Sequence, residues 1–409
     1  MHRLELRDIG GIHRPPRIAL IIERFDARRG GAESYTRDLA TWLAAVGGDV
    51  HVLARQIGDA ERTLPLSFHS LDPAKGSGAF VAAVREQLAA LRPDISHDMG
   101  VAFDCDVFQS HVGSPTACQR AADMAHSPAI RLLRRVAQEF PRRRRIRRLA
   151  ARQFGGLSPV FLAVSQRVAD DLMHMHAVPV GRIRVVHNGV DAERFHPRRH
   201  GDAGALIRRR HGIGPDDVLV IAVANNHRLK GIHVLVRAIR RLRHEGLPIK
   251  ALVCGDATAG GPRRDGGVIY AGHVTDTAAH YAAADIAAQP SFYDACSLTT
   301  LEALASGLPV ITTRANGAGE LITHGVDGLV LDNTRDERPL AAALGWLATD
   351  RWHRAQLARA GRALALAHSV DRAFGGVVAA YAEVVASRGA CLVYEPHEPA
   401  TPRDYRIAA

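Results

Sequence analysis

Short apolar runs alternate with amphipathic stretches along the first half of the chain. Apolar runs bounded by turn residues predict buried strands, and apolar positions that recur every three to four residues predict helices. Strands that alternate with helices indicate a parallel sheet with helices on both faces, in which ligands bind at the carboxyl ends of the strands. The predicted strands are 17–23, 49–53, 94–97, 107–111, 160–164 and 183–186, and the predicted helices are 33–46, 78–91 and 168–176.

The same alternation starts again after a polar, basic stretch at 196–211, which we predict to be a linker. A chain of 409 residues also exceeds one ordinary hydrophobic core. We therefore predict an α/β fold of two Rossmann-like βαβ lobes that face a central cleft. The lobes are 1–195 and 196–370, followed by a closing helix at 371–387 and a loose tail at 388–409. The second set of predicted strands is 218–223, 250–254, 286–289 and 309–312, and the predicted helices are 231–244, 278–284, 298–306, 339–347, 351–367 and 370–387.

Composition narrows the class of protein. Hydrophobic residues make up 47% of the chain and charged residues 23%, as in an ordinary globular protein. No apolar run is long enough to cross a bilayer, and the first residues lack the apolar stretch of a signal peptide, so we expect a cytoplasmic protein. The five cysteines are scattered without a CxxC pair, which predicts neither a disulfide framework nor a zinc site. A net charge of +11 favours anionic partners.

The strongest chemical signal lies between Pro290 and Val310. Asp294 falls in a predicted loop, and Glu302 follows eight residues later within a predicted helix. Residues 295–299 between them include the start of that helix, where unpaired backbone N–H groups favour a diphosphate. Carboxylates repel phosphate, so Asp294 and Glu302 are predicted to bind hydroxyl groups beside it, one on a sugar and the other on a ribose.

This stretch resembles the retaining glycosyltransferases of family GT4, which have the GT-B fold. Their mark is two acids separated by seven residues, then Ala-x-x-x-Gly-x-Pro-Val, which ends here at Val310. The resemblance is nearest to lipopolysaccharide core glucosyltransferases. It implies that Asp294, where the family has Glu, contacts the donor sugar, and that Glu302 binds the ribose. It also implies that Ser297, where the family has Gly, and Leu298 contribute to the diphosphate site. Residues 163–195 and 317–330 match the family as well.

The resemblance extends to the rest of a donor site. In the family a basic pair after the first strand of the second lobe holds the diphosphate. Lys230 matches its lysine, whereas Asn225 stands where an arginine is expected, and Arg228 is predicted to supply that charge. Gly31, in the Gly30–Gly31 loop before the first helix, is predicted to approach the diphosphate as well. A plain strand-to-helix turn is the alternative for this loop.

A histidine near the donor sugar is common in the family. His111, at the end of the strand 107–111, is the predicted catalytic histidine, and His97 is the second candidate. The Asp104-Cys-Asp106 triplet reads as a DxD metal motif, but the donor pattern lies about 190 residues away. We therefore predict no metal and no cofactor. The leaving diphosphate itself is expected to take the acceptor's proton, while the protein positions the substrates and stabilises charge.

An arginine-rich segment spans 127–154, and Glu139 is the single acid within it. Apolar residues interleave with the arginines, which favours an amphipathic surface element for anionic lipid. Arg142, Arg143, Arg144 and Arg145 are the predicted membrane-binding residues. A solvated charged helix is the alternative; nucleic acid is not predicted, because no recognition fold accompanies the segment.

These features together predict a retaining, metal-independent hexosyltransferase. It would take a sugar from a nucleotide sugar, by the resemblance UDP-glucose, to a glycolipid or lipopolysaccharide-type acceptor. It would act as a peripheral protein at the inner face of the cell membrane. Two alternatives stay open: a nucleotide-sugar epimerase of GT-B-like fold, and a catalytically degenerate basic adaptor that binds membranes.

Overall fold

The computed structural model describes residues 3–7, 13–71, 77–101, 105–126, 130, 139–155, 158–255, 263–332 and 335–395. Within these ranges the strands form two seven-stranded sheets and one three-stranded sheet. Contacts between residues divide the chain into two compact units, which are described separately. The first unit is Met1–Gln109, Leu157–Phe161 and Phe374–Ala409, and the second is Ser110–Gly156 and Leu162–Ala373.

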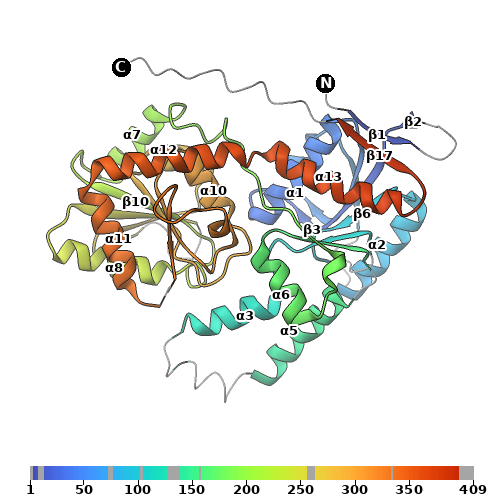
Figure 1. The fold of residues 1–409 in the computed structure, drawn as a ribbon, viewed down its shortest axis with the longest axis horizontal. Helices are drawn as coiled ribbons and strands as arrows, with labels where there is room; N and C mark the ends of the chain where they lie inside the picture. Colours follow the sequence, from blue (N-terminus) through green and yellow to red (C-terminus); the bar gives the residue numbers. More distant parts are fainter. Residues whose placement is uncertain are drawn as a thin grey trace. The chain divides into compact units, whose positions relative to one another are not determined.

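The first large sheet has the order β5-β4-β3-β6-β7-β8-β9. Its central strand β3 (Arg17–Phe25) pairs in parallel with β4 (Asp49–Ile57) and β6 (Ile95–Asp98). The residues from Ile18 to Ile21 are fully buried, which is why this strand reads as a continuous apolar run. The other strands are β5 (Ser67–Ser70), β7 (Val107–Gln109), β8 (Val160–Ala163) and β9 (Ile183–Val185). The helices between them are α1 (Gly31–Ala45), α2 (Ser77–Leu91), α3 (Pro115–Met124), α5 (Glu139–Phe154) and α6 (Gln166–His176) (Figure 1).

The second large sheet has the order β12-β13-β11-β10-β14-β15-β16 and is parallel except at its edge strand β12. One face carries the apolar side chains of α8 and α11, which pack together with those of β10 and β11 in one hydrophobic cluster. The strands are β10 (Val218–Val223), β11 (Ile249–Cys254), β12 (Arg263–Asp265), β13 (Val268–Gly272), β14 (Ile286–Ala288), β15 (Val310–Thr313) and β16 (Leu329–Leu331). The helices are α7 (Gly201–Arg210), α8 (Ile232–His244), α9 (Thr277–Ala282), α10 (Leu298–Ala305), α11 (Glu337–Thr349), α12 (Arg351–Ala367) and α13 (Val370–Ala386).

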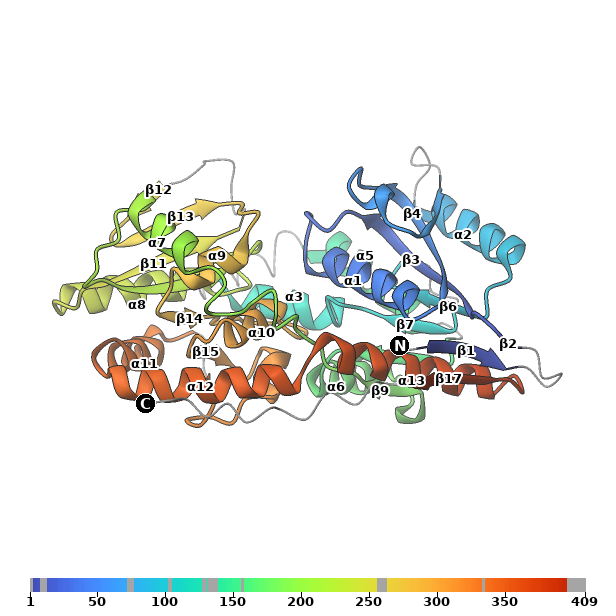
Figure 2. The ribbon, with the colours of Figure 1, turned by 90° about the horizontal axis from the view of Figure 1, so that it is seen from above.

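Both ends of the described chain meet in the three-stranded sheet. β1 (Arg3–Arg7) pairs antiparallel with β17 (Cys391–Glu395) and with β2 (His13–Arg14) (Figure 2). The predicted loose tail is therefore wrong for Cys391–Glu395, because these residues gain a strand partner from the other end of the chain. Residues 396–409 of that prediction lie outside the described residues.

Helix α13 explains why the end of the chain belongs to the first unit. Phe374 on α13 packs edge-on against Tyr35 of α1, with ring centroids 5.3 Å apart. Further along, the Tyr381 hydroxyl lies 2.7 Å from Nδ1 of His97 at the end of β6. All four of these side chains are buried or nearly so, with Tyr381 and His97 fully inside. The helix thus closes the core of the first unit.

The prediction of a linker at 196–211 is also wrong for most of these residues, because Gly201–Arg210 forms helix α7. The helix packs on α9, and a side chain at Gly204 would stand 2.7 Å from the backbone of Ala282. Arg208 donates to the carbonyl oxygens of Ala283, Gly214 and Asp217 and to the carboxylate of Asp285. A helix that docks through a guanidinium and a glycine has no apolar stripe, so its pattern resembles a loop. The predicted domain boundary at residue 195 stays a prediction.

Candidate functional site

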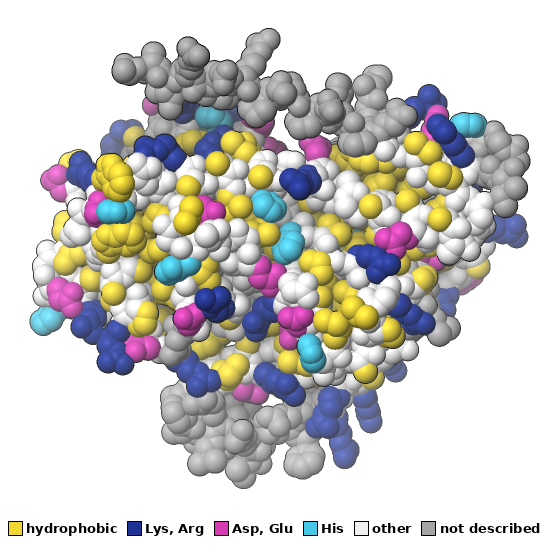
Figure 3. Space-filling model, viewed as in Figure 1, with side chains coloured by type: hydrophobic (Ala, Val, Ile, Leu, Met, Phe, Trp, Pro, Cys, Tyr) yellow, Lys and Arg dark blue, Asp and Glu magenta, His cyan; other side chains and the backbone are white. Residues whose placement is uncertain are grey.

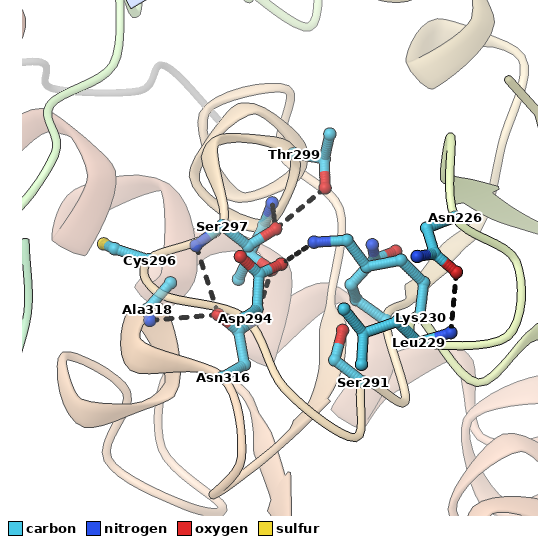
Figure 4. A network of polar contacts seen from close by, with 12 residues as sticks. Asn226, Leu229, Lys230, Ser291, Asp294, Cys296, Ser297, Thr299, Asn316 and Ala318 are labelled. Carbon is cyan, nitrogen blue, oxygen red and sulfur yellow. Dashed lines mark hydrogen bonds and ion pairs between the residues drawn. The ribbon is translucent and has the colours of Figure 1, made fainter. Parts of the chain in front are cut away.

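The candidate site lies at the carboxyl ends of β10 and β14, which are neighbours in the second sheet. The loop after β10 carries Lys230 and the loop after β14 carries Asp294, so parallel pairing brings both to one edge. The Lys230 ammonium forms an ion pair with Oδ2 of Asp294 (Figure 4). The two side chains are 22% and 11% exposed, which leaves the pair open to solvent on one side. The structure therefore brings together two residues that the sequence analysis assigned to one donor site.

Backbone hydrogen bonds fix the Lys230 loop. The amide of Lys230 donates to the carbonyl of Asn226 at 2.9 Å, and the amide of Phe292 donates to the carbonyl of Leu229 at 2.8 Å. The second bond ties this loop to the one that leads to Asp294. Gly231 follows with φ of +71°, a conformation that side chains disfavour, and a Cβ there would stand 1.9 Å from the Pro290 carbonyl oxygen. Lys230 is thus held between a tight turn and the neighbouring loop.

The loop that carries Asp294 is held along its whole backbone. Asp294 donates to the carbonyl of Ala315 at 3.0 Å and accepts from the amide of Gly317 at 2.9 Å. The Ser165 hydroxyl donates to the carbonyl of Ala295 at 2.6 Å, and the Asn188 side chain donates to the carbonyl of Cys296 at 2.8 Å. A loop fixed at each of these residues presents its carboxylate in one position.

Asn316 is the main residue that the sequence analysis missed. Its side chain is fully buried and makes four hydrogen bonds. The amide oxygen accepts from the backbone N–H of Ser297 at 3.2 Å and of Ala318 at 3.1 Å, as Figure 4 shows. The amide nitrogen donates to the hydroxyls of Thr300 at 3.0 Å and Thr312 at 2.9 Å. One side chain thereby joins the start of α10 to the end of β15.

These contacts bear on the predicted role of Ser297. Its backbone N–H is bonded to Asn316, and its hydroxyl caps α10 by accepting from the amide of Thr300 at 3.3 Å. The Ser297 N–H is therefore not one of the free amides at this helix start, and the predicted place of Ser297 in the diphosphate site stays a prediction. Among the described residues, however, the amides of Leu298 and Thr299 have no hydrogen-bond acceptor. These two N–H groups and the Lys230 ammonium can bind an anion at the start of α10.

Glu302 lies one turn further along α10. The Tyr281 hydroxyl is 3.1 Å from Oε2 of Glu302 and 3.1 Å from the carbonyl of Thr299. Burial raises the pKa of Tyr281 well above its ordinary value, and the Glu302 carboxylate raises it further, so the phenol keeps its proton. A buried hydrogen-bond donor thus orients a partly exposed carboxylate. No motif in the sequence singled out Tyr281, which lies on a different helix.

A second buried network lies under Asp294. The Tyr293 hydroxyl donates to Oδ2 of Asp171 at 2.9 Å and accepts from the backbone N–H of Ser114 at 3.1 Å. The Ser114 hydroxyl lies 2.8 Å from Nε2 of His176, whose ring stacks on Phe154 at the end of α5. Burial raises the pKa of Asp171, while the Tyr293 hydrogen bond opposes that shift. The residue before Asp294 is therefore anchored to α3 and α6.

The remaining predicted donor residues have different surroundings. Nη1 of the exposed Arg228 lies 2.6 Å from Nδ1 of His126, so its guanidinium contacts that ring. Gly31 is the first residue of α1 in the first unit, after an extended Gly30 with φ of 175°. The structure does not test whether Arg228 or Gly31 contacts a diphosphate, so both assignments stay predictions.

The two histidine candidates differ in burial. His97 is fully buried beside Tyr381, which gives it a place in the core of the first unit. His111 lies in the turn after β7, and burial lowers its pKa to about 3. His111 is therefore neutral at physiological pH, and its catalytic role stays a prediction.

Asp106, the second acid of the DxD triplet, has a carboxylate that is already bound by other residues of the protein. The Asp106 carboxylate accepts from the amide and hydroxyl of Ser96, both at 2.8 Å, and pairs with Arg388. Asp104 lies outside the described residues. In the part of the chain that is described, no three His, Cys, Asp or Glu side chains gather as a metal-binding group.

The arginine-rich segment includes helix α5. Arg144, Arg147 and Arg148 are exposed on it, and Leu149 is 40% exposed. Figure 3 shows Lys and Arg side chains grouped at the lower right, where Figure 1 draws α5. The side chains of Arg142, Arg143 and Arg145 lie outside the described ones. No described helix combines the length and apolar character that a membrane span requires.

Solved structures of glycosyltransferases share this fold. WaaG, a glycosyltransferase involved in lipopolysaccharide biosynthesis, is 19% identical with a TM-score of 0.71, over 89% of this chain and 98% of that one. The sucrose-phosphate synthase of Thermosynechococcus elongatus is 20% identical with a TM-score of 0.69, over 91% and 100%. HepE of Anabaena in complex with UDP-glucose is 19% identical with a TM-score of 0.66, over 91% and 99%. The fold, two Rossmann-like parallel-sheet units, is thus the α/β architecture of GT-B glycosyltransferases.

Family models identify both halves. A model described as Glycosyltransferase Family 4 matches residues 29–194, and one described as Glycosyl transferases group 1 matches residues 216–350. The first segment is thus similar to a family 4 glycosyltransferase domain and the second to a group 1 glycosyltransferase domain.

Curated relatives by sequence have a different acceptor in their name from the one predicted. A D-inositol 3-phosphate glycosyltransferase of Salinispora arenicola is 32% identical over 250 residues, which are 56% of this chain and 55% of the relative. A protein of the same name from Pseudarthrobacter chlorophenolicus is 26% identical over 340 residues, 74% of this chain and 78% of that one. The chain spans little more than half the length of the first relatives that it matches. The predicted nearness to lipopolysaccharide core glucosyltransferases stays a prediction.

Proposed function

We propose that this protein is a retaining, metal-independent glycosyltransferase that uses a nucleotide-sugar donor. The observation that carries the proposal is the cluster of Lys230, Asp294 and the two open amides of Leu298 and Thr299 at one sheet edge. The amides and the ammonium suit a diphosphate, which needs several donors and positive charge. Asp294, beside them, suits the hydroxyls of the transferred hexose, and Glu302 suits the hydroxyls of the ribose.

The proposed chemistry follows from where charge develops. As the bond from the sugar to the diphosphate breaks, negative charge grows on the leaving oxygen. Preorganised donors at that oxygen stabilise the transition state more than the ground state. The hydrogen-bonded loops at 226–231 and 294–297 fix the backbone that carries these donors. The leaving phosphate takes the proton of the acceptor hydroxyl, which attacks from the same face and retains the anomeric configuration.

The Lys230–Asp294 ion pair lies at this site. We propose that the donor separates the pair, so that the ammonium turns to the diphosphate and the carboxylate to the sugar. The exchange replaces one charge-assisted contact by two.

UDP-glucose is the proposed donor. Support comes from the family resemblance and from the structural neighbour HepE, whose crystal structure is a complex with UDP-glucose. For the acceptor we propose a glycolipid or lipopolysaccharide-type molecule at the inner face of the cell membrane. The exposed arginines of α5 beside exposed Leu149 support contact with an anionic membrane surface. A phosphorylated polyol is the second candidate acceptor, favoured by the name of the sequence relatives.

The test is turnover of a panel of nucleotide sugars in the presence of a chelator, with membrane-lipid extract or inositol phosphate as acceptor. Glu302→Ala and Lys230→Ala are expected to lose product formation by more than about 100-fold, since each removes a group that binds the donor. Glu245→Ala, which removes an exposed acid paired with Arg241 in the same unit, is the matched control. Conversion of the donor to an epimer without any acceptor would favour the epimerase alternative. Absence of donor binding would favour the adaptor alternative.

A further inference from the structure

A cationic pocket lies in the first unit and is lined by none of the residues assigned above, although Arg29 in its lining lies in the same loop as Gly31. It sits at the carboxyl ends of β3, β4 and β5, the edge where parallel sheets bind ligands. Its volume is about 350 Å³, which is within the range of small-molecule sites. The lining residues are Arg24, Asp26, Arg29, Arg55, Gln56, Ile57, Gly58, Arg62 and Ser70.

The lining of this pocket carries more positive than negative charge, although Nε of Arg55 lies 3.7 Å from Oε1 of Glu23, which is not among the lining residues. Four guanidinium groups line it against the single carboxylate of Asp26. That carboxylate is already engaged, because it accepts a 3.0 Å hydrogen bond from Arg28 and lies 3.6 Å from Arg29. The Arg28 hydrogen bond is the main cause of the lowered pKa of Asp26, so the group stays ionised but shared. Arg24 and Arg62 have no ion pair or side-chain hydrogen bond with any described residue.

The pocket combines a fixed cation with adjustable ones. The Arg55 guanidinium stacks over the Phe80 ring at 4.6 Å, and its side chain is only 12% exposed. The loops around it are joined, because Oε1 of the buried Glu61 accepts from the amide of Ala27 at 3.1 Å. Gly58 leaves the space for Glu61, since a Cβ there would stand 2.2 Å from Oε2. The loops around the pocket are therefore held together by these contacts and do not move independently.

The walls also suit a ligand that is more than a bare anion. The Gln56 amide and the Ser70 hydroxyl are exposed on the lining and can exchange hydrogen bonds with ligand hydroxyls. Guanidinium forks match phosphate oxygens in pairs, and several together prefer a doubly charged phosphate monoester to a carboxylate. Because the volume far exceeds that of a phosphate ion, the remainder fits a small polyhydroxylated body.

We propose that this pocket binds a phosphate monoester of a sugar or polyol, with the phosphate on Arg24, Arg29 and Arg62 and the hydroxyls on Gln56 and Ser70. Phosphate binding stands on the pocket alone. That the bound molecule is the acceptor rests on the proposed function, and it then makes the acceptor a phosphorylated one.

Calorimetric titration of the full chain with glucose 6-phosphate, inorganic phosphate and glucose tests the proposal, at low salt and without nucleotide sugar. Glucose 6-phosphate is expected to bind at least about tenfold more tightly than inorganic phosphate, and glucose not at all. The double variant Arg24→Gln/Arg62→Gln is expected to weaken sugar-phosphate binding at least about tenfold, because it removes two charge-assisted contacts. The double variant Arg37→Gln/Arg85→Gln removes the same charge from α1 and α2 outside the pocket and is expected to bind as the wild type does.

Three results would overturn the proposal. They are no sugar-phosphate binding by the wild type, equal binding by the two double variants, or equal affinity for inorganic phosphate and glucose 6-phosphate. Nucleotide-sugar hydrolysis measured on the same preparations separates this inference from the proposed function. A chain that hydrolyses the donor but binds no sugar phosphate would refute the pocket's role and leave the transferase. A chain that binds sugar phosphate but no donor would do the reverse. Thermal unfolding of both variants without ligand checks that each is folded, which is expected because Arg24 and Arg62 are exposed.

Discussion

At the residue scale, the most constrained side chain of the candidate site is one that touches no proposed ligand. The acids and the lysine of the site stand out in the sequence because they follow a recognisable spacing. Asn316 does not stand out, because no sequence pattern around this single asparagine predicts that it bridges β15 and α10. Its importance lies in partners that are close only in the folded chain, namely Ser297, Thr300 and Thr312.

Asn316→Leu is expected to lower the free energy of unfolding by about 2–4 kcal/mol. The leucine is close in shape, but it leaves the amides of Ser297 and Ala318 buried without acceptors. Denaturant unfolding of the two proteins measures the difference. Asn225→Leu is the control, since Asn225 is exposed, and a change there is expected to stay within about 0.5 kcal/mol. A loss at Asn316 no larger than in the control would refute the bridging role.

His111 gives a prediction in the pH dependence of stability. Its pKa is lowered to about 3 by burial, below the ordinary value of 6.5 that it regains on unfolding. Between these two values the unfolded chain binds the extra proton, so this histidine's contribution is complete above pH 6.5 and is lost progressively as the pH falls towards 3. Because the His111 side chain is partly exposed, the effect is smaller than for a fully buried ring. We expect this histidine to lower the free energy of unfolding at pH 5 by about 1 kcal/mol relative to neutral pH.

The measurement is the unfolding free energy of wild type and His111→Gln at pH 7.5 and pH 5. The wild type is expected to lose more stability on acidification than the variant does. The same experiment on His233→Gln is a parallel case, because burial also lowers that pKa, to about 4. Identical pH dependence in wild type and His111→Gln would contradict the burial of a neutral ring.

At the scale of elements, the periodic pattern of apolar residues predicted most of the strands and helices of both large sheets. It missed elements that are stabilised by contacts other than a local apolar stripe. β3 and β10 are buried on both faces and read directly as apolar runs. α7 docks through Arg208 and Gly204, and α3, which begins at the Ser114–Pro115 cap, buries only the small side chains of Ala117 and Ala121. Neither helix therefore shows a stripe of large apolar residues. β1 and β17 stabilise each other across the whole chain, a pairing that no local window contains. The start of α10 shows the same limit, because which amides stay open depends on Asn316.

The junction of β10 and α8 carries a prediction of its own. Gly231→Ala is expected to cost more than about 2 kcal/mol of stability, because the residue has a left-handed φ of +71° and its Cβ would collide with the Pro290 carbonyl. The relief of that clash shifts Lys230 away from Asp294. We therefore expect nucleotide-sugar binding to weaken by at least about tenfold, even at temperatures where the variant is folded.

Gly246→Ala separates strain from collision. Gly246 also has a positive φ, of 90°, but an added Cβ there meets no atom within 4 Å. This control is expected to lose stability without losing donor affinity. Calorimetric titration with UDP and thermal unfolding of both variants make the comparison. Equal donor affinity in Gly231→Ala and Gly246→Ala would show that the Lys230 position does not depend on this turn.

At the scale of the whole molecule, the net charge of +11 is concentrated in part on one helix. If α5 is the membrane-binding element, replacing Arg142 to Arg145 by Gln is expected to weaken binding to phosphatidylglycerol vesicles by about 1000-fold at low salt. Each arginine near an anionic surface contributes about 1 kcal/mol at low salt, and screening reduces this at higher ionic strength. Vesicle co-sedimentation at two salt concentrations measures the effect, with phosphatidylcholine vesicles as the uncharged surface.

General charge attraction is the competing explanation, and a matched variant decides between the two. Four exposed arginines on other helices are replaced by Gln in that variant, which lowers the net charge by the same amount. They are Arg210, Arg241, Arg351 and Arg359. If the charge acts through α5, this control keeps most of the vesicle binding. If both variants lose binding equally, the attraction belongs to the total charge, and the peripheral membrane location proposed here would rest on the acceptor alone. Transfer to a soluble acceptor should stay unchanged in the α5 variant in either case, because none of its substituted residues belongs to the donor site.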